Sequence, residues 1–213
     1  MKLIVFRCTE CGARLTFKEG SVLYPCKNCK VWFEIKDSKL VPVFFLTPPN
    51  PELMKEADIA LPFRLFKIAP PADCWQEGET RRSEIFLWIE AFDYSTTSSV
   101  PTNHPGLSIS AAKQRTIHWV KSRHVPKLIT CSKTRTQCLE LLGPFVQVLA
   151  GGVWDKIKTE SSFYIMSEQV VALPFSTKDN IELLYGTRLN IYRYEKNQGF
   201  DFSDDGTESS YHK

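Results

Sequence analysis

The sequence predicts an α+β protein in which a small N-terminal module precedes a larger, mainly β domain with one or two helices. Three observations lead to this fold class. Two Cys-x-x-Cys pairs lie within residues 8–29, close to the start of the chain. Strand-length apolar runs occur at 83–92 and repeatedly between 161 and 194, and apolar residues over 134–149 have helical spacing.

The composition is that of a folded protein. Hydrophobic residues make up 43% and charged residues 24% of the 213 positions, which suits a globular core. No apolar run approaches the roughly 20 residues that span a bilayer. The apolar run in MKLIVFRC is shorter than the about 7–15 residues of a signal peptide. We therefore expect a cytoplasmic protein, where paired cysteines are metal ligands more often than disulfides.

The two cysteine pairs are Cys8–Cys11 and Cys26–Cys29, separated by fourteen residues. Zn²⁺ prefers four tetrahedral ligands, and a Cys-x-x-Cys turn places two thiolates on one side of a tight loop. Gly12 follows the first pair, where a positive φ is often needed, but Lys30 stands at the equivalent place after the second pair. We expect one structural zinc ion per chain, because four thiolates leave no position for a catalytic water. An iron centre or two disulfides are the alternatives.

The residues around the thiols indicate a short β structure. RLTFKEG predicts a strand that ends at Gly20, SVLYPC returns towards the cysteines, and KVWFEIK alternates with Val31, Phe33 and Ile35 on one face. This pattern resembles the zinc-ribbon proteins over residues 1–38. The resemblance implies structural zinc and a binding role, without naming a partner. A module this small buries little core, and structural zinc supplies about 10–16 kcal/mol in zinc-finger peptides.

A proline-rich linker is expected over 39–56, because LTPPNPE favours extended chain. The α+β domain would then cover 57–196. Its strongest strand is SEIFLWIEAF at 83–92. In the helical stretch, Thr134 and Gln137 form a capping box, and Gly143–Pro144 should kink or divide the helix.

Towards the C-terminus, four short strands are predicted in SSFYIM, EQVVALPF, NIELLY and RLNIYRY, with YGT as a hairpin turn. The segments IALPF at 59–63 and VALPF at 171–175 nearly match, through either an internal duplication or a coincidence of two proline-containing strands. From residue 197 the chain is acidic and poor in apolar residues, which predicts a disordered tail over 197–213.

No Asp or Glu occurs from Tyr94 to Leu139, although basic residues are frequent there. Basic side chains interleaved with an aromatic suit phosphate contacts and base stacking, or an acidic protein surface. The formal net charge is only +3, and a four-thiolate site with one divalent ion would lower it to +1. A charge this low argues against a strong electrostatic field around the whole protein. The candidate residues for binding a partner or nucleic acid are Lys113, Arg115, Trp119, Lys121, Arg123, Lys127, Lys133 and Arg135.

A second set of metal-compatible residues is His118, His124, Cys131 and Cys138, but its spacing matches no known knuckle, and Cys138 also fits the core stripe of the helix. No catalytic signature such as G-x-S-x-G or H-E-x-x-H is present. The first hypothesis is therefore a non-catalytic zinc-binding protein that docks another protein as an accessory or assembly subunit. Nucleic-acid binding through 113–135 is the alternative, and an unrecognised enzyme is the third.

Overall fold

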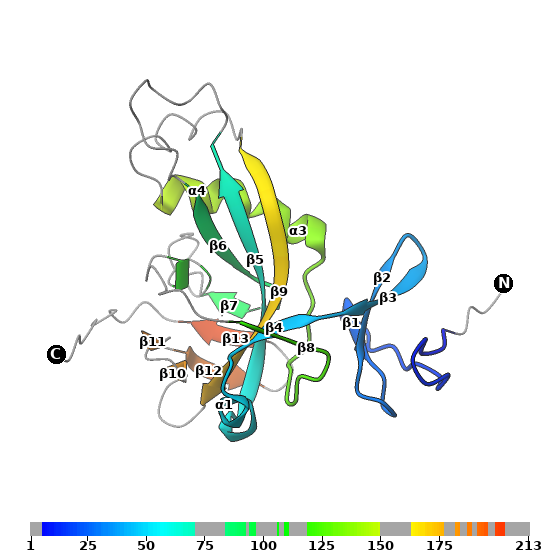
Figure 1. The fold of residues 1–213 in the computed structure, drawn as a ribbon. Coiled ribbons are helices and arrows are strands. Elements are labelled where there is room, and N and C mark those ends of the chain that lie inside the picture. The colour runs from blue at the N-terminus through cyan, green and yellow to red at the C-terminus, as the bar shows by residue number, and fades with distance from the viewer. Residues whose placement is uncertain are drawn as a thin grey trace.

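The structure is a computed structural model that describes residues 6–70, 84–92, 94–96, 106, 109–110, 119–149, 163–176, 182–183, 187–188, 191–195 and 199–202. Side chains are described for these residues up to 176, apart from 94–96 and 149. The fold is α+β, as predicted: a cysteine-bearing N-terminal module precedes a β-rich body (Figure 1). We call residues 6–43 the N-terminal module, and the described residues from 44 onward the body.

The N-terminal module contains a three-stranded antiparallel sheet in the order β1-β2-β3. Its strands are β1 (Leu23–Pro25), β2 (Trp32–Lys36) and β3 (Lys39–Val43). Lys36 lies opposite Lys39, so Asp37 and Ser38 form a two-residue turn. Both turn residues have positive φ, 48° and 61°, as a type I′ hairpin requires. RLTFKEG is not a strand: its one ladder contact is an isolated bridge between Arg14 and Arg7.

Residues 39–56, for which the sequence suggested a linker, hold three elements: β3, β4 (Phe45–Thr47) and α1 (Pro51–Glu56). The prolines there have a local role. Asn50 caps α1 by accepting a hydrogen bond from the Glu52 amide at 3.0 Å. Pro51 occupies the first helical position, where its missing N–H costs nothing. Proline content therefore marks a helix start here.

The body is built on two long antiparallel strands, β5 (Ile59–Ala69) and β9 (Tyr164–Ser176). β9 is one 13-residue strand, so the prediction of separate strands in SSFYIM and EQVVALPF was wrong. β6 (Ile85–Glu90) pairs with β5 on its other edge. β4 pairs in parallel with β9, and β8 (Val120–Ser122) pairs with β4.

The helical stretch is divided in two, as predicted. α3 (Arg135–Glu140) begins with the capping box of Thr134 and Gln137, and α4 (Leu142–Leu149) follows after Leu141. Pro144 falls in the first turn of α4, where proline is tolerated. Figure 1 shows both helices running along β5, β6 and β9, where Phe145, Cys138 and Phe66 belong to one buried apolar cluster.

The remaining strands are β7 (Tyr94–Thr96), β10 (Glu182–Leu183), β11 (Thr187–Arg188), β12 (Ile191–Glu195) and β13 (Gly199–Phe202). β10 and β11 form the hairpin expected around YGT. β13 pairs with β12 and β7, so residues 199–202 are ordered as a strand within the segment expected to be disordered. Residues 203–213 lie outside the described residues.

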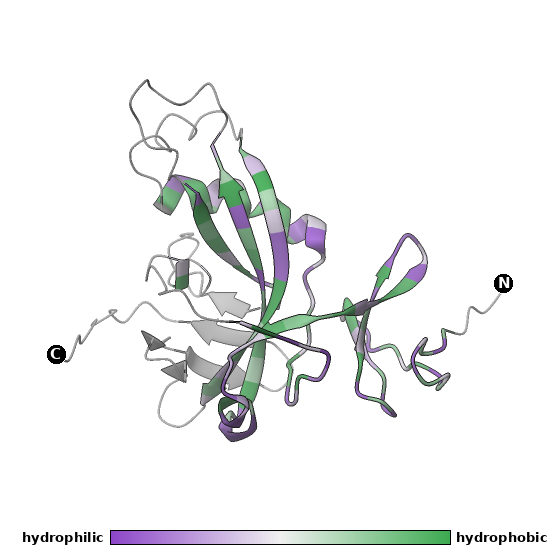
Figure 2. Ribbon diagram, viewed as in Figure 1, coloured by the Kyte–Doolittle hydropathy of each residue, from purple (hydrophilic) through white to green (hydrophobic). Residues whose placement is uncertain are grey.

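Two apolar clusters lie on opposite faces of the β5–β6–β9 layer. One includes Phe66, Leu87 and Phe145 beneath the helices, and the other includes Phe63 and Trp88. Apolar residues predominate along these strands, and polar ones at the tip of the β2–β3 hairpin (Figure 2). Leu23 of the N-terminal module belongs to the helix-side cluster, so module and body share a core. None of the helices in the described part of the chain is long and apolar enough to cross a membrane.

Candidate metal centre and the basic segment beside it

The four paired cysteines converge. Their sulfurs all lie within 4.8 Å of one another. Two of the contacts join the two turns: Cys8 Sγ lies 3.5 Å from Cys29 Sγ, and Cys11 Sγ lies 3.6 Å from Cys26 Sγ. Four sulfurs at about 2.3 Å from one zinc ion would be about 3.8 Å apart, whereas a disulfide would bring two within about 2.05 Å. The geometry is compatible with a zinc-ribbon-like metal site.

The two Cys-x-x-Cys turns have the same backbone structure. In the first, the Cys8 amide donates to Ala13 O at 2.8 Å and the Gly12 amide donates to Cys8 O at 2.9 Å. In the second, the Cys26 amide donates to Val31 O at 2.8 Å and the Lys30 amide donates to Cys26 O at 2.9 Å. Each turn therefore presents its two sulfurs in the same way.

Lys30 accepts the conformation that Gly12 adopts. Their φ values are 61° and 74°, both in the left-handed region. That region costs a residue with a Cβ about 1–2 kcal/mol. The Lys30 ammonium donates to Lys27 O at 2.7 Å, which offsets part of the strain. The departure from glycine noted in the sequence changes the residue but leaves the turn intact.

The thiols differ in their proton affinities. A hydrogen bond from Asn28, together with the Ala13 amide, lowers the pKa of Cys11 to about 6. Burial raises the pKa of Cys8. At Cys29 the Val31 amide favours the thiolate, yet burial and the neighbouring sulfurs raise the pKa to about 12. A bound divalent cation would hold all the sulfurs as thiolates, because its charge outweighs these local effects.

Residues 119–135 fasten the N-terminal module to the body. The Val22 amide donates to Cys131 O at 2.7 Å, and Lys18 Nζ donates to Thr130 Oγ1 at 2.7 Å. Arg123 Nη1 pairs with Glu10 Oε2 at 3.0 Å. Its guanidinium carbon also lies 4.6 Å from the centre of the Phe44 ring. Much of the acid-free segment therefore makes structural contacts.

Three of the other candidate binding residues, Lys127, Lys133 and Arg135, also bond within the chain. Lys127 Nζ donates to Ala57 O at 2.5 Å, and Lys133 Nζ donates to Phe92 O at 2.7 Å. Arg135 Nε donates to Glu168 at 2.6 Å. The centroid of the Trp119 ring lies 5.6 Å from that of the Trp88 ring. Lys121, in contrast, is exposed on β8. Lys113 and Arg115 lie outside the described residues.

The second metal set is not assembled among the residues that the structure describes, where the only group of three or more potential ligands is the four-cysteine cluster. Cys131 and Cys138 are buried, and burial raises their pKa values to about 12 and about 11. They act as apolar core residues. His118 lies outside the described residues.

Sequence reasoning missed a buried charge on β5. The Arg64 side chain is 2% exposed, and its guanidinium donates to Glu34 at 2.7 Å and to Glu168 at 2.6 Å. Burial alone would lower the pKa of Arg64, but the two carboxylates raise it. The available signal was a lone arginine in the otherwise apolar run IALPFRLF.

No protein-family model, curated protein or solved structure matches this chain.

Proposed function

We propose that this chain is a non-catalytic zinc-binding protein that docks another protein, as an accessory or assembly subunit of the cytoplasm. Zinc is the metal that fits best, because four thiolates complete its preferred coordination. A closed set of ligands leaves no site for a reacting water, so the ion would support the fold. The N-terminal module then serves as a rigid platform attached to the body.

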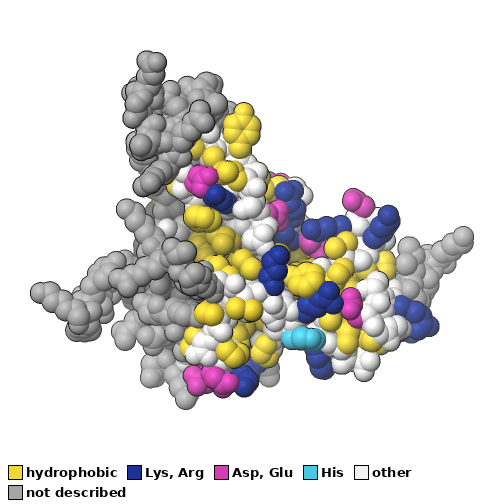
Figure 3. All heavy atoms as spheres, in the orientation of Figure 1, with side chains coloured by type: hydrophobic (Ala, Val, Ile, Leu, Met, Phe, Trp, Pro, Cys, Tyr) yellow, Lys and Arg dark blue, Asp and Glu magenta, His cyan; other side chains and the backbone are white. Residues whose placement is uncertain are grey.

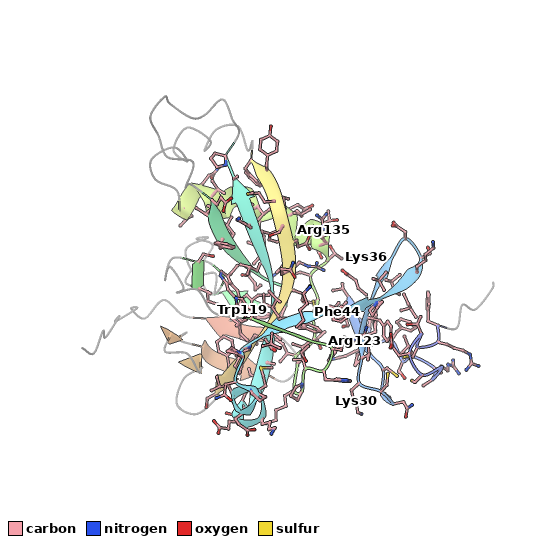
Figure 4. The ribbon with its side chains drawn as sticks, viewed as in Figure 1. Lys30, Lys36, Phe44, Trp119, Arg123 and Arg135 are labelled. Carbon is pink, nitrogen blue, oxygen red and sulfur yellow. The ribbon has the colours of Figure 1, made fainter. Side chains whose placement is uncertain are left out.

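The observation that carries this proposal is the exposed ring of Phe44. Phe44 lies between β3 and β4, where the N-terminal module meets the body, and 43% of it is exposed. Arg123 covers one face of the ring and is itself held by Glu10. Aromatic and arginine side chains on a rigid frame are the usual anchors of protein interfaces. Phe44 and Arg123 lie together at this junction (Figure 4).

The chemistry around Phe44 indicates the kind of partner. Figure 3 shows Lys and Arg side chains gathered around apolar atoms at the junction. Lys121 is exposed on β8 and lies opposite Leu46 of β4, two residues after Phe44. A partner segment with one buried apolar side chain and flanking carboxylates would complement this surface.

Nucleic-acid binding remains the alternative function because Lys121 and the exposed Phe44 ring could contact a phosphate and a base. Docking of a protein is better supported. Arg123, Lys127, Lys133 and Arg135 each have a partner within the chain. Cationic side chains that already have a partner within the chain contribute less to phosphate binding.

Co-purification from the native source tests the proposal. Phe44→Ala should release the partner protein, whereas Phe86→Ala should retain it, because Phe86 is 53% exposed but lies at the other end of the sheet on β6. Both variants must keep their metal for the comparison to hold. Retention of the partner by Phe44→Ala, or its loss from the wild type after nuclease treatment, would contradict docking through this surface.

A further inference from the structure

A chain of five charged side chains joins the N-terminal module to both layers of the body. Arg64, on β5, donates from Nη2 to Glu34 Oε1 on β2 and from Nη1 to Glu168 Oε1 on β9. The second oxygen of Glu168 accepts from Arg135 Nε on α3 at 2.6 Å. The second oxygen of Glu34 lies 3.1 Å from Lys36 Nζ. Figure 4 shows the two ends of this chain, Arg135 and Lys36, facing each other across the junction.

The body supplies only one of the two carboxylates that pair with the Arg64 guanidinium. The other comes from the N-terminal module, and Arg64 Nε is buried with no hydrogen-bond partner in the described structure. A buried guanidinium that loses a carboxylate is not rehydrated, so breaking such a pair is much more damaging than breaking an exposed one. The β5–β9 sheet therefore depends on Glu34 being in place.

The position of Glu34 depends in turn on the cysteine turns. β2 begins three residues after Cys29, and Phe33 packs in the module core with Cys8, Cys26 and Val31. Leu23 of β1 lies directly opposite Glu34. Two of the proposed metal ligands belong to this small core, so loss of the ion would weaken the packing that holds Phe33 and, with it, the neighbouring Glu34.

We propose that metal binding at the four cysteines controls the stability of the β5–β9 sheet through the Glu34–Arg64 ion pair. When the metal is lost, β2 loosens, Glu34 withdraws and Arg64 keeps only Glu168. Coupling is reciprocal, so the ion pair also strengthens metal binding. The body is then firmly folded only in the metal-loaded chain, whether or not the protein docks a partner.

Metal affinity, measured on the full chain by competition with a chromophoric zinc chelator, gives the first test. Glu34→Gln keeps the size of the side chain and removes its charge, and we expect zinc affinity to fall roughly 10- to 100-fold. Glu19→Gln is the matched control, because Glu19 is also a module carboxylate but is exposed and lies outside both Cys-x-x-Cys turns. It should change the affinity less than about fivefold. An unchanged affinity in Glu34→Gln would overturn the proposal.

Hydrogen exchange gives the second test, which begins with the wild type. After chelation of the wild type, amides of β5 and β9 beside Arg64 and Glu168 should exchange faster along with those of β2. Exchange that rises in β2 but stays unchanged in β5 and β9 would show that the module opens independently, and would overturn the proposal. In Glu34→Leu/Arg64→Met, where apolar groups replace the pair, chelation should open β2 and spare β5. If exchange in β5 still became faster after chelation of this variant, the ion pair would be excluded as the connection between the metal site and the sheet.

Discussion

Leu61 on β5 lies directly opposite Leu173 on β9, and the near-identical segments IALPF and VALPF pair symmetrically about this point. Ile59 meets Phe175 at one end and Phe63 meets Val171 at the other. The two segments are thus related by a local two-fold axis between adjacent antiparallel strands. The two similar segments in the sequence are therefore neighbouring strand segments that pair with each other.

This register explains why two central strands tolerate proline. The N–H and C=O of Ala60 bond to Lys127 O and to the Ile129 amide, on the side away from β9. Pro62 O likewise accepts from the Ala91 amide. Pro174, opposite Ala60, and Pro62, opposite Ala172, therefore occupy positions where the β5–β9 ladder needs no N–H.

A pair of substitutions tests this explanation. Leu173→Pro should destabilise the protein by about 3 kcal/mol or more, because it removes a ladder N–H and places the ring against β5. Pro174→Ala, one position away, should cost only about 0.4–1 kcal/mol, chiefly by adding freedom to the unfolded chain. Urea unfolding of the metal-loaded chain measures both. Similar losses in the two variants would contradict the proposed register.

Lys30 offers a stabilising substitution. Lys30→Gly should raise the free energy of unfolding by about 1 kcal/mol, because glycine adopts the φ of 61° without a Cβ clash. Gly12→Ala, at the equivalent place in the other turn, should lower it by a similar amount. Chemical unfolding and zinc content check both. Destabilisation by Lys30→Gly would mean that the hydrogen bond to Lys27 O outweighs the backbone strain.

The cysteine cluster could be predicted from the sequence because each pair of thiols is placed by its own turn. Cys-x-x-Cys spacing, a residue with positive φ and a following strand are all local features. The capping box at Thr134 was predictable for the same reason. Local patterns of this kind report geometry within a few residues.

The attachment of the module to the body could not be predicted in this way. Arg64 finds its carboxylates 30 and 104 residues away along the chain, and no spacing rule links such positions. The acid-free segment predicts a basic binding surface, whereas Arg123, Lys133 and Arg135 pair with Glu10, Glu90 and Glu168 from other elements. Composition shows where charges lie in the sequence, but tertiary structure decides which remain free.

Metal content is the next prediction. The chain purified without added metal should carry one zinc ion and little iron, because the thiolate set is complete and closed. Cys26→Ser should reduce bound zinc strongly, since it removes a buried ligand, whereas Cys131→Ser should leave zinc content unchanged. Elemental analysis measures both. A red iron-loaded product, or two disulfides with little metal, would contradict the assignment of zinc.

Nucleic-acid retention separates the two candidate functions. If Lys121 and its neighbours neutralised phosphates, affinity for a single strand would fall with salt, with a log–log slope of about −0.7 per contact. Stacking on Phe44 would add about 1–3 kcal/mol, lost in Phe44→Ala. We expect instead weak retention that disappears by physiological salt, because the cations around Lys121 are held by internal partners.

Lys121→Glu is the decisive variant, because Lys121 is exposed and its reversal spares the pairs that hold the module to the body. Reversal of Arg123 would instead break its contact with Glu10, so loss of binding in that variant would be ambiguous. Fluorescence anisotropy with a labelled single strand, over a series of salt concentrations, measures the slope. Tight binding at physiological salt that Lys121→Glu abolishes would favour nucleic acid over a protein partner. If Phe44→Ala also retained the native protein partner, docking of that partner at the Phe44 surface would be excluded.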